Sequence, residues 1–179
     1  MKAIPWEVDE GKFSDAYVAG FFDGDGSLVA ILEKQSVRYL RTYRPRIKIN
    51  FTQHIRYFEM LCGVQKYLGV GKVSIAKTHN QAELVIVDRN EVSRILNRML
   101  PHLVLKKRQA ILALEALSQF GENLRTNRIS DENYQAILKI IAKIRNLNSN
   151  TGEKRKFSSF DPVTTSPVLG GSYRNAIKS

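Results

Sequence analysis

The spacing of hydrophobic positions predicts a series of helices and strands from residue 14 onwards. Residues 14–23 form an apolar run with helical spacing, and residues 27–33 are rich in Val, Ile and Leu, as strands are. Residues 44–53 alternate between apolar and polar side chains, so this strand would cover a core with one face and present cations on the other. The inward set is Ile47, Ile49 and Phe51, and the outward set is Arg46, Lys48 and Asn50.

The rest of the chain continues with a second helix and strand pair and then becomes helical. The predicted elements are a helix at 55–68, a hairpin of strands at 72–77 and 81–87, and helices at 91–100, 106–120 and 130–146. Gly69 and Gly121 are expected to close two of these helices, and Pro101 a third. The inner stripe of the helix at 106–120 is expected to be Ala110, Ile111, Leu114 and Leu117.

The composition indicates a nucleic-acid partner. The chain has 179 residues, a formal net charge of +11 and a pI near 9.9, which favour nucleic acid first and an anionic membrane surface second. Its length suits one domain, expected over residues 1–147, with a basic irregular tail over residues 148–179. No apolar run approaches the roughly 20 residues of a membrane span, so we expect an intracellular protein without a membrane partner. The lone Cys62 excludes an intramolecular disulfide and a thiolate-rich zinc site.

Residues 17–28 carry the chemistry that most restricts the function. An apolar run ends there in two acidic residues interleaved with glycines. Gly24 and Gly26 are expected to end the helix, because glycine adopts backbone conformations that other residues avoid. Asp23 and Asp25 would then lie at a helix C-terminus, where the helix dipole is already negative. A divalent cation that prefers oxygen ligands, Mg²⁺ or Ca²⁺, would offset this charge. The alternative is a buried helix with a glycine-rich C-terminal cap.

The segment Val18–Gly26, which reads VAGFFDGDG, resembles the defining motif of the LAGLIDADG homing endonucleases. The resemblance extends over residues 14–147. It implies an α+β fold, the αββαββα saddle of that family with extra C-terminal helices, whose antiparallel sheet lies along the major groove of double-stranded DNA. The implied DNA contacts are Arg44, Arg46, Lys48 and Asn50 of one strand, Lys72, Ser74, Gln81 and Glu83 of the hairpin, and the phosphate contacts Lys107 and Arg108. The alternative is a basic strand face that is simply solvated.

The same resemblance implies a catalytic centre. Asp25 would hold a divalent metal with the help of the Gly24 carbonyl oxygen. Gln53 would orient the attacking water, and Lys106 would stabilise the charge of the transition state. If the comparison of residues 103–110 with the family is shifted by one residue, Lys107 takes the catalytic role in place of Lys106. The metal is expected to be Mg²⁺, with Mn²⁺ as a possible substitute, whereas Ca²⁺ would bind without supporting cleavage.

One motif supplies one carboxylate site, yet cutting both strands of a duplex requires two. A homodimer with twofold symmetry meets this need, with its motif helices packed through Ala19, Gly20 and Phe21. The resemblance then implies double-strand cleavage of a long, nearly palindromic DNA target, with 5′ phosphates and 3′ overhangs on the products. Asp23 is expected to be structural, as a cap or a support for its neighbours.

Two other functions stay open on the same scaffold. A maturase would bind intron RNA and assist splicing, and a regulator would bind DNA without cutting it. Neither needs Asp25, Gln53 or Lys106, so these residues favour the nuclease. Other nuclease signatures are weak: residues 79–80 lack the remaining spacing of an HNH site, and the E-x-K pattern of residues 10–12 lies outside any predicted strand.

Overall fold

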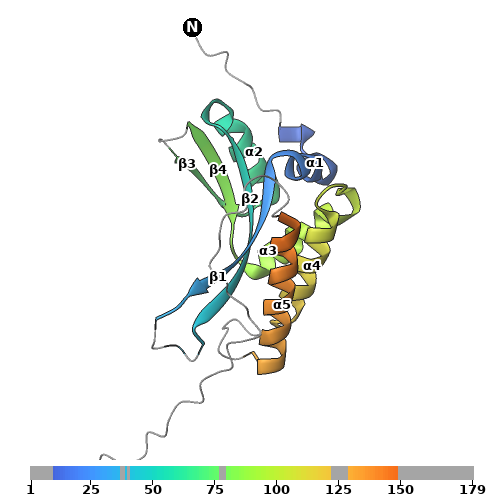
Figure 1. Ribbon diagram of the computed structural model, residues 1–179. Coiled ribbons are helices and arrows are strands. Elements are labelled where there is room, and N and C mark those ends of the chain that lie inside the picture. The colour runs from blue at the N-terminus through green and yellow to red at the C-terminus, as the bar shows by residue number, and fades with distance from the viewer. Residues whose placement is uncertain (1–9, 37–38, 40, 77–79, 122–128, 149–179) are drawn as a thin grey trace, which may run out of the picture.

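The computed structural model describes residues 10–36, 39, 41–76, 80–121 and 129–148, which form one four-stranded sheet packed against helices (Figure 1). The helices are α1 (Asp15–Asp25), α2 (Phe58–Leu68), α3 (Arg89–Met99), α4 (Lys107–Ser118) and α5 (Asp131–Asn148). The strands are β1 (Gly26–Lys34), β2 (Tyr43–His54), β3 (Lys72–Ala76) and β4 (Gln81–Ile86). The 3-10 turns are η1 (Glu10–Lys12), η2 (Ile55–Tyr57) and η4 (Leu100–His102). The tail predicted over residues 148–179 lies outside the described residues from residue 149 onwards.

The sheet is antiparallel throughout and has the strand order β1-β2-β4-β3. β1 pairs with residues 43–51 of β2, whereas β4 pairs with β2 only from Ile49 to His54. Figure 1 shows the helices of the described residues gathered on one side of the sheet, and we call the other side, which none of these helices covers, the open face. The predicted order of helices and strands is therefore confirmed, and it is that of an α+β fold.

The face of the sheet that meets the helices is apolar, as the alternation within residues 44–53 predicts. Ile47, Ile49 and Phe51 are buried, and Leu84 and Ile86 of β4 join them in the core. Full burial of each large aliphatic or aromatic side chain contributes roughly 1.5–3 kcal/mol. A slip of one residue would move all of these side chains into water, so the pattern fixes which side chains point to the open face.

Helix α1 extends two residues beyond the predicted end at residue 23. Gly24 lies within the helix, and the chain leaves it at Gly26 with a φ of −85°, which any residue adopts easily. Glycine is needed at position 26 for a different reason: a Cβ there would lie 2.3 Å from Phe22 Cδ2 and 2.8 Å from Phe22 Cα. Close approach of the strand to the helix therefore explains Gly26. At Gly69, by contrast, the φ of +73° confirms that glycine ends α2 by its backbone freedom.

The inner stripe predicted for the helix at 106–120 is wrong at Ile111, which is 49% exposed. The helix turns a neighbouring stripe of smaller side chains towards the core, and Leu114 is only partly buried. The inward residues are Ala110, Ala113, Ala116 and Leu117. Because alanine side chains are short, α5 packs directly along α4 in the layer behind the sheet (Figure 1).

Two helix boundaries also differ from the predicted ones. The helix expected at 55–68 begins with the 3-10 turn η2, and the helix expected at 91–100 begins earlier, at Arg89, because Asp88 caps it. Pro101 lies inside η4 rather than directly after a helix. None of the helices in the described ranges combines the length and the apolar character that a membrane crossing needs.

Candidate active site

The exposed end of α1 brings Asp25 next to Gln53. Asp25 is the last residue of the helix, and Gln53 Nε2 donates a hydrogen bond of 2.5 Å to Asp25 Oδ2. Gln53 shares its side of β2 with Ile49 and Phe51, so its amide points to the helix layer at the place where the core ends. The sheet register thereby places a carboxylate and an oriented amide side by side, although 28 residues separate them in the sequence.

Asp23, only two residues before Asp25, has a different environment. It is 9% exposed and accepts three backbone N–H groups, from Val104 at 2.7 Å, Leu105 at 3.1 Å and Lys106 at 2.9 Å. Burial raises the pKa of Asp23, but the three N–H groups and the charge of Lys106 together lower it below its usual value. The structural role predicted for Asp23 is confirmed, since it anchors the start of α4 to the end of α1. Its charge therefore needs no metal.

Lys106 lies against the same helix end. Its Nζ donates a hydrogen bond of 2.5 Å to the backbone carbonyl of Asp23 and lies 5.8 Å from the centroid of the Phe22 ring. An ammonium group at a helix C-terminus is favourable because the last carbonyl groups are partly negative. Of the two lysines considered in the sequence analysis, Lys106 is therefore the one whose ammonium group contacts the end of α1, whereas Lys107 is exposed on the first turn of α4.

The donor atoms at this end of α1 fit a hard cation but do not complete its coordination. The Asp25 carboxylate and the Gly24 carbonyl are oxygen donors, which suit Mg²⁺ or Ca²⁺ better than zinc. No group of three or more His, Cys, Asp or Glu side chains within the described residues could hold a metal ion. Among the described residues this helix end thus offers one carboxylate for a metal, that of Asp25, and further ligands would have to come from elsewhere, such as water, phosphate oxygens or a second copy.

The sheet register places all eight strand residues predicted to contact DNA on the open face. On β2 these residues alternate with the buried ones. A residue that pairs with an outward-facing residue of β2 also faces outward on β4, and the same rule extends from β4 to β3. Thr52 pairs with Glu83, which pairs in turn with Ser74 of β3. The open face includes Arg44, Arg46, Lys48 and Asn50 of β2, Lys72 and Ser74 of β3, and Gln81 and Glu83 of β4.

The same register adds a row of residues from β1 that the sequence analysis did not include. Ser27, Val29 and Ile31 lie opposite outward-facing residues of β2 and share their face. Glu33 ends this row, and its Oε2 lies 2.7 Å from Arg46 Nε. The alternation of residues 27–33 could have revealed the row, but a short aliphatic strand can also be buried on both faces.

The surface of α1 differs from the predicted dimer interface in one residue. Ala19 is wrong, because it is fully buried in the core of its own chain and has no surface to offer. Gly20 is exposed, and Phe21 is half-buried and stacked on Phe51 with 5.2 Å between the ring centroids. With the exposed Tyr17 and Gly24, Gly20 and Phe21 have the spacing i, i+3, i+4, i+7 of one helix face.

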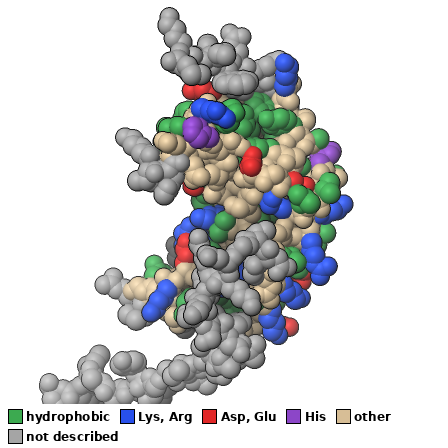
Figure 2. All heavy atoms as spheres, turned by 45° about the horizontal axis from the view of Figure 1, so that its top comes forward, with side chains coloured by type: hydrophobic (Ala, Val, Ile, Leu, Met, Phe, Trp, Pro, Cys, Tyr) green, Lys and Arg blue, Asp and Glu red, His purple; other side chains and the backbone are tan. Residues whose placement is uncertain are grey.

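Hydrophobic side chains continue this face beside α4. Val104 and Leu105, which follow η4, are 81% and 76% exposed. Figure 2 brings the α1 end of the molecule forward and shows hydrophobic side chains gathered there, with side chains of both charges at their margin. We call Tyr17, Gly20, Gly24, Val104 and Leu105 the α1 face.

The motif Val18–Gly26, the sheet and the residues at the helix end all lie within one family profile. The profile described as LAGLIDADG endonuclease matches residues 18–110, about half of the chain. The chain belongs to the LAGLIDADG endonuclease family. The predicted family and fold are thus confirmed.

Individual family members agree with this assignment. The DNA endonuclease I-CvuI from Chlorella vulgaris is 32% identical over 112 residues, which cover 62% of this chain and 66% of I-CvuI, slightly less than two thirds of that protein. The crystal structure of I-CvuI with its DNA target and calcium matches with a TM-score of 0.69 and 26% identity, over 80% of this chain and 85% of that one. I-CvuI with the I-CreI target and magnesium, in which the DNA is not cleaved, matches with a TM-score of 0.68 and 26% identity, over 79% and 84% of the two chains. The archaeal intron-encoded I-Vdi141I in complex with DNA shares the fold at 21% identity, with a TM-score of 0.64 over 83% of this chain and 89% of that one.

Proposed function

We propose that this LAGLIDADG chain is a site-specific DNA endonuclease that acts as a homodimer and makes a metal-dependent double-strand break. The observation that carries the proposal is the arrangement at the end of α1. There the exposed Asp25 carboxylate accepts a hydrogen bond from the Gln53 amide, and the Lys106 ammonium group lies against the same helix end. A protein that only bound nucleic acid would gain nothing from this arrangement.

Asp25 and the Gly24 carbonyl would hold the metal ion. When bound, a divalent ion polarises the scissile phosphate and lowers the pKa of a coordinated water. Mg²⁺ is the proposed ion and Mn²⁺ a substitute, whereas Ca²⁺ would bind without cleavage. Support comes from the oxygen donors of the site and from the relative I-CvuI, whose DNA complexes were crystallised in the presence of magnesium or calcium.

The side chains of the protein contribute orientation and charge. The Gln53 amide holds one oxygen of Asp25 in place and offers its own oxygen to a water molecule. The Lys106 ammonium would stabilise the negative charge that develops on the phosphate being cut. Asp23 fixes the backbone of Lys106, so the ammonium is positioned before any substrate arrives. This pre-organisation is the reason to assign Lys106 rather than Lys107 to the reaction.

The proposed dimer would form through the α1 face, with Phe21 at its border. Glycines at positions 20 and 24 allow two helices to approach closely, and the exposed Val104 and Leu105 would be buried by the second copy. The twofold axis would bring two Asp25 carboxylates together, one for each DNA strand. A symmetric protein reads a symmetric site, so the target would be long and nearly palindromic.

The open face of the sheet would lie in the major groove. Its arginines and Lys48 can pair with guanine, and Asn50 and Gln81 with adenine. Lys107 and Arg108 would contact phosphates. The products would carry 5′ phosphates and 3′ overhangs. A chain with this activity would work inside a cell, where its DNA target lies.

The proposal is tested by a cleavage selection on a randomised duplex library. The wild-type protein is incubated with the library in Mg²⁺, in Ca²⁺ and in EDTA, and the cut ends are sequenced. We expect the protein to cut at one nearly palindromic sequence in Mg²⁺ and to cut nothing in Ca²⁺ or in EDTA. If the protein enriches duplexes without cutting any of them, the endonuclease proposal is wrong, and the next ligand to test is intron RNA, as a maturase would require.

A further inference from the structure

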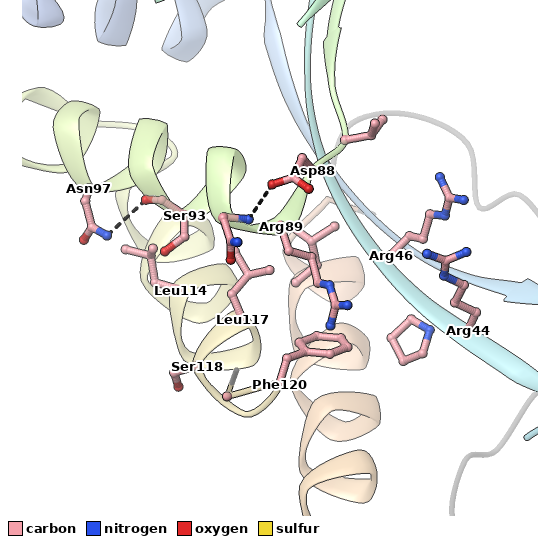
Figure 3. Close-up of a pocket in the computed structure, with 15 residues that line it drawn as sticks. Arg44, Arg46, Asp88, Arg89, Ser93, Asn97, Leu114, Leu117, Ser118 and Phe120 are labelled. Carbon is pink, nitrogen blue, oxygen red and sulfur yellow. Dashed lines mark hydrogen bonds between the residues drawn. The ribbon is translucent and has the colours of Figure 1, made fainter. Parts of the chain in front are cut away.

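A hollow of about 880 Å³ lies beside the open face, where β2 extends past the end of β4. Its wall is formed by Arg44 and Arg46 of β2, by Arg89 at the start of α3 and by Phe120 after α4. Figure 3 shows the side chains of Arg44 and Arg46 on one side of the hollow and those of Arg89 and Phe120 on the other. We call it the arginine hollow.

The position of the hollow follows from the strand lengths. The last paired residue of β4, Ile86, lies opposite Ile49, so residues 43–48 of β2 pair with β1 alone. The chain turns there through Asp88 into α3. The hollow therefore lies along the unpaired edge of β2 and reaches back to α3 and α4, and Arg44 and Arg46 of its wall also belong to the open face.

The described side chains that line the hollow carry more positive than negative charge. Three arginines line it, of which Arg46 is paired with Glu33, and Asp88 is the one carboxylate among the described lining residues. Asp88 Oδ1 is engaged as a helix cap, since it accepts the N–H groups of Asn90 at 2.9 Å and Glu91 at 3.1 Å. Its charge is thus held at the end of α3 and offsets only part of the positive charge.

Arg89 is held in place before any ligand binds. Its guanidinium carbon lies 4.3 Å from the centroid of the Phe120 ring, a stacking contact that fixes the plane of the group. Burial, and secondly the charge of Arg44, lowers the pKa of Arg89, so the two guanidinium groups repel one another across the hollow. An anion between them would remove this repulsion.

We propose that the arginine hollow binds a backbone phosphate of the DNA that lies on the open face, with Arg89 and Arg44 as its two cationic ligands. The proposal rests on the proposed function, because it needs a duplex along the sheet. The planar donors of arginine match the oxygens of a phosphodiester. Ser93 and Asn90 supply neutral polar groups nearby, and Leu117 belongs to an apolar wall that suits the deoxyribose next to the phosphate. Arg89 then sets the position of the duplex without reading its sequence.

The test removes the charge with Arg89→Gln and measures binding to a duplex of arbitrary sequence over a series of salt concentrations. We expect affinity to fall by roughly tenfold, as for loss of one charge-assisted contact. The slope of log affinity against log salt should fall by about one unit. Arg94→Gln is the control: it removes the same charge from the same helix, but Arg94 points to Glu91 and to the Leu68 carbonyl instead. Arg94→Gln should leave the slope unchanged.

A second measurement identifies the phosphate. Each phosphate of the duplex is replaced in turn by a neutral methylphosphonate. One replacement should weaken the wild type but not Arg89→Gln, because the contact is already lost in the variant. Thermal unfolding of both variants shows that each is folded, and Arg89→Lys, which keeps the charge, should retain the salt slope.

The outcomes separate this proposal from the proposed function. If Arg89→Gln binds a duplex with the affinity and salt slope of the wild type, or if no methylphosphonate position distinguishes them, the hollow holds no phosphate, while the endonuclease proposal stands. If the wild type binds no duplex at all, both proposals are wrong.

Discussion

The three N–H groups at the start of α4 make the stability of the fold depend on Asp23, and Asp23→Asn measures that dependence. Asp23 Oδ2 accepts the N–H groups of Val104 and Leu105, and Oδ1 accepts that of Lys106. Asparagine has one side-chain oxygen, so at least one of these N–H groups must face an amide NH₂ group and lose its acceptor. The substitution also removes a negative charge from a helix N-terminus.

The expected cost follows from these losses. An unsatisfied buried donor costs about 1–3 kcal/mol, and the lost charge adds roughly 0.3–1 kcal/mol. We therefore expect Asp23→Asn to lower the free energy of unfolding by about 2–3 kcal/mol, which lowers the Tm of a chain of this size by roughly 4–12 °C.

The effect should depend on pH. In the folded protein the pKa of Asp23 is lowered, because the three N–H groups and Lys106 together outweigh the effect of burial, which acts the other way. A lowered carboxyl pKa gives stability that is fully present above the unfolded-state pKa of about 3.9 and is lost as the pH falls through the folded-state pKa. The difference in Tm between the wild type and Asp23→Asn should be full at pH 7 and should shrink below about pH 4.

Thermal unfolding followed by circular dichroism measures both quantities. Asp88→Asn is the matched control, since Asp88 is an exposed N-cap of α3 and Asn caps helices as well as Asp does. We expect its Tm to stay within a degree or two of the wild type, roughly the size of an exposed surface change. The reasoning is refuted if Asp23→Asn is no less stable than Asp88→Asn at pH 7.

Two further predictions follow from the open face and the α1 face. Gly20→Leu should give a folded monomer, because a Cβ at Gly20 meets nothing within 4 Å and leucine favours helices. Light scattering after gel filtration would measure the mass of the variant. A variant that stays dimeric and cuts DNA would rule out this interface. Arg46→Ala should weaken binding by a factor that depends on the base opposite, measured on single-base variants of the selected target; an equal loss on all of them would make Arg46 a phosphate contact.

The sequence predicted the sheet better than the helix faces. The alternation in residues 44–53 allows only one face of the strand to be buried, because a shift of one residue would expose Ile49 and Phe51. Both side chains are buried in the structure. On a helix, apolar residues on neighbouring stripes are harder to separate. Ile111 belongs to the more hydrophobic stripe of α4, yet the close packing of α5 favours the alanines. The prediction that Ala19 lies in the dimer interface is wrong because the small size of a helical residue does not show which way it points.

The candidate site was predicted through the motif and not through spacing. Gln53 lies 28 residues from Asp25, and Lys106 lies 83 residues from Asp23, so only the folded sheet and helices bring them together. The partner of Asp23 could not be predicted, because backbone N–H groups have no signature in a sequence. The sequence analysis did not include Arg89, because only the folded chain brings this single arginine at a helix start opposite the arginines of β2.

The central claim is that Asp25 takes part in cleavage and not in folding or DNA recognition. It is tested most directly by giving the wild type and Asp25→Asn the selected duplex in Mg²⁺ and measuring bound and cut DNA in the same samples. We predict that both proteins bind with similar affinity and that cutting by Asp25→Asn is undetectable. Unchanged cutting by Asp25→Asn, or loss of binding together with cutting, would contradict the claim.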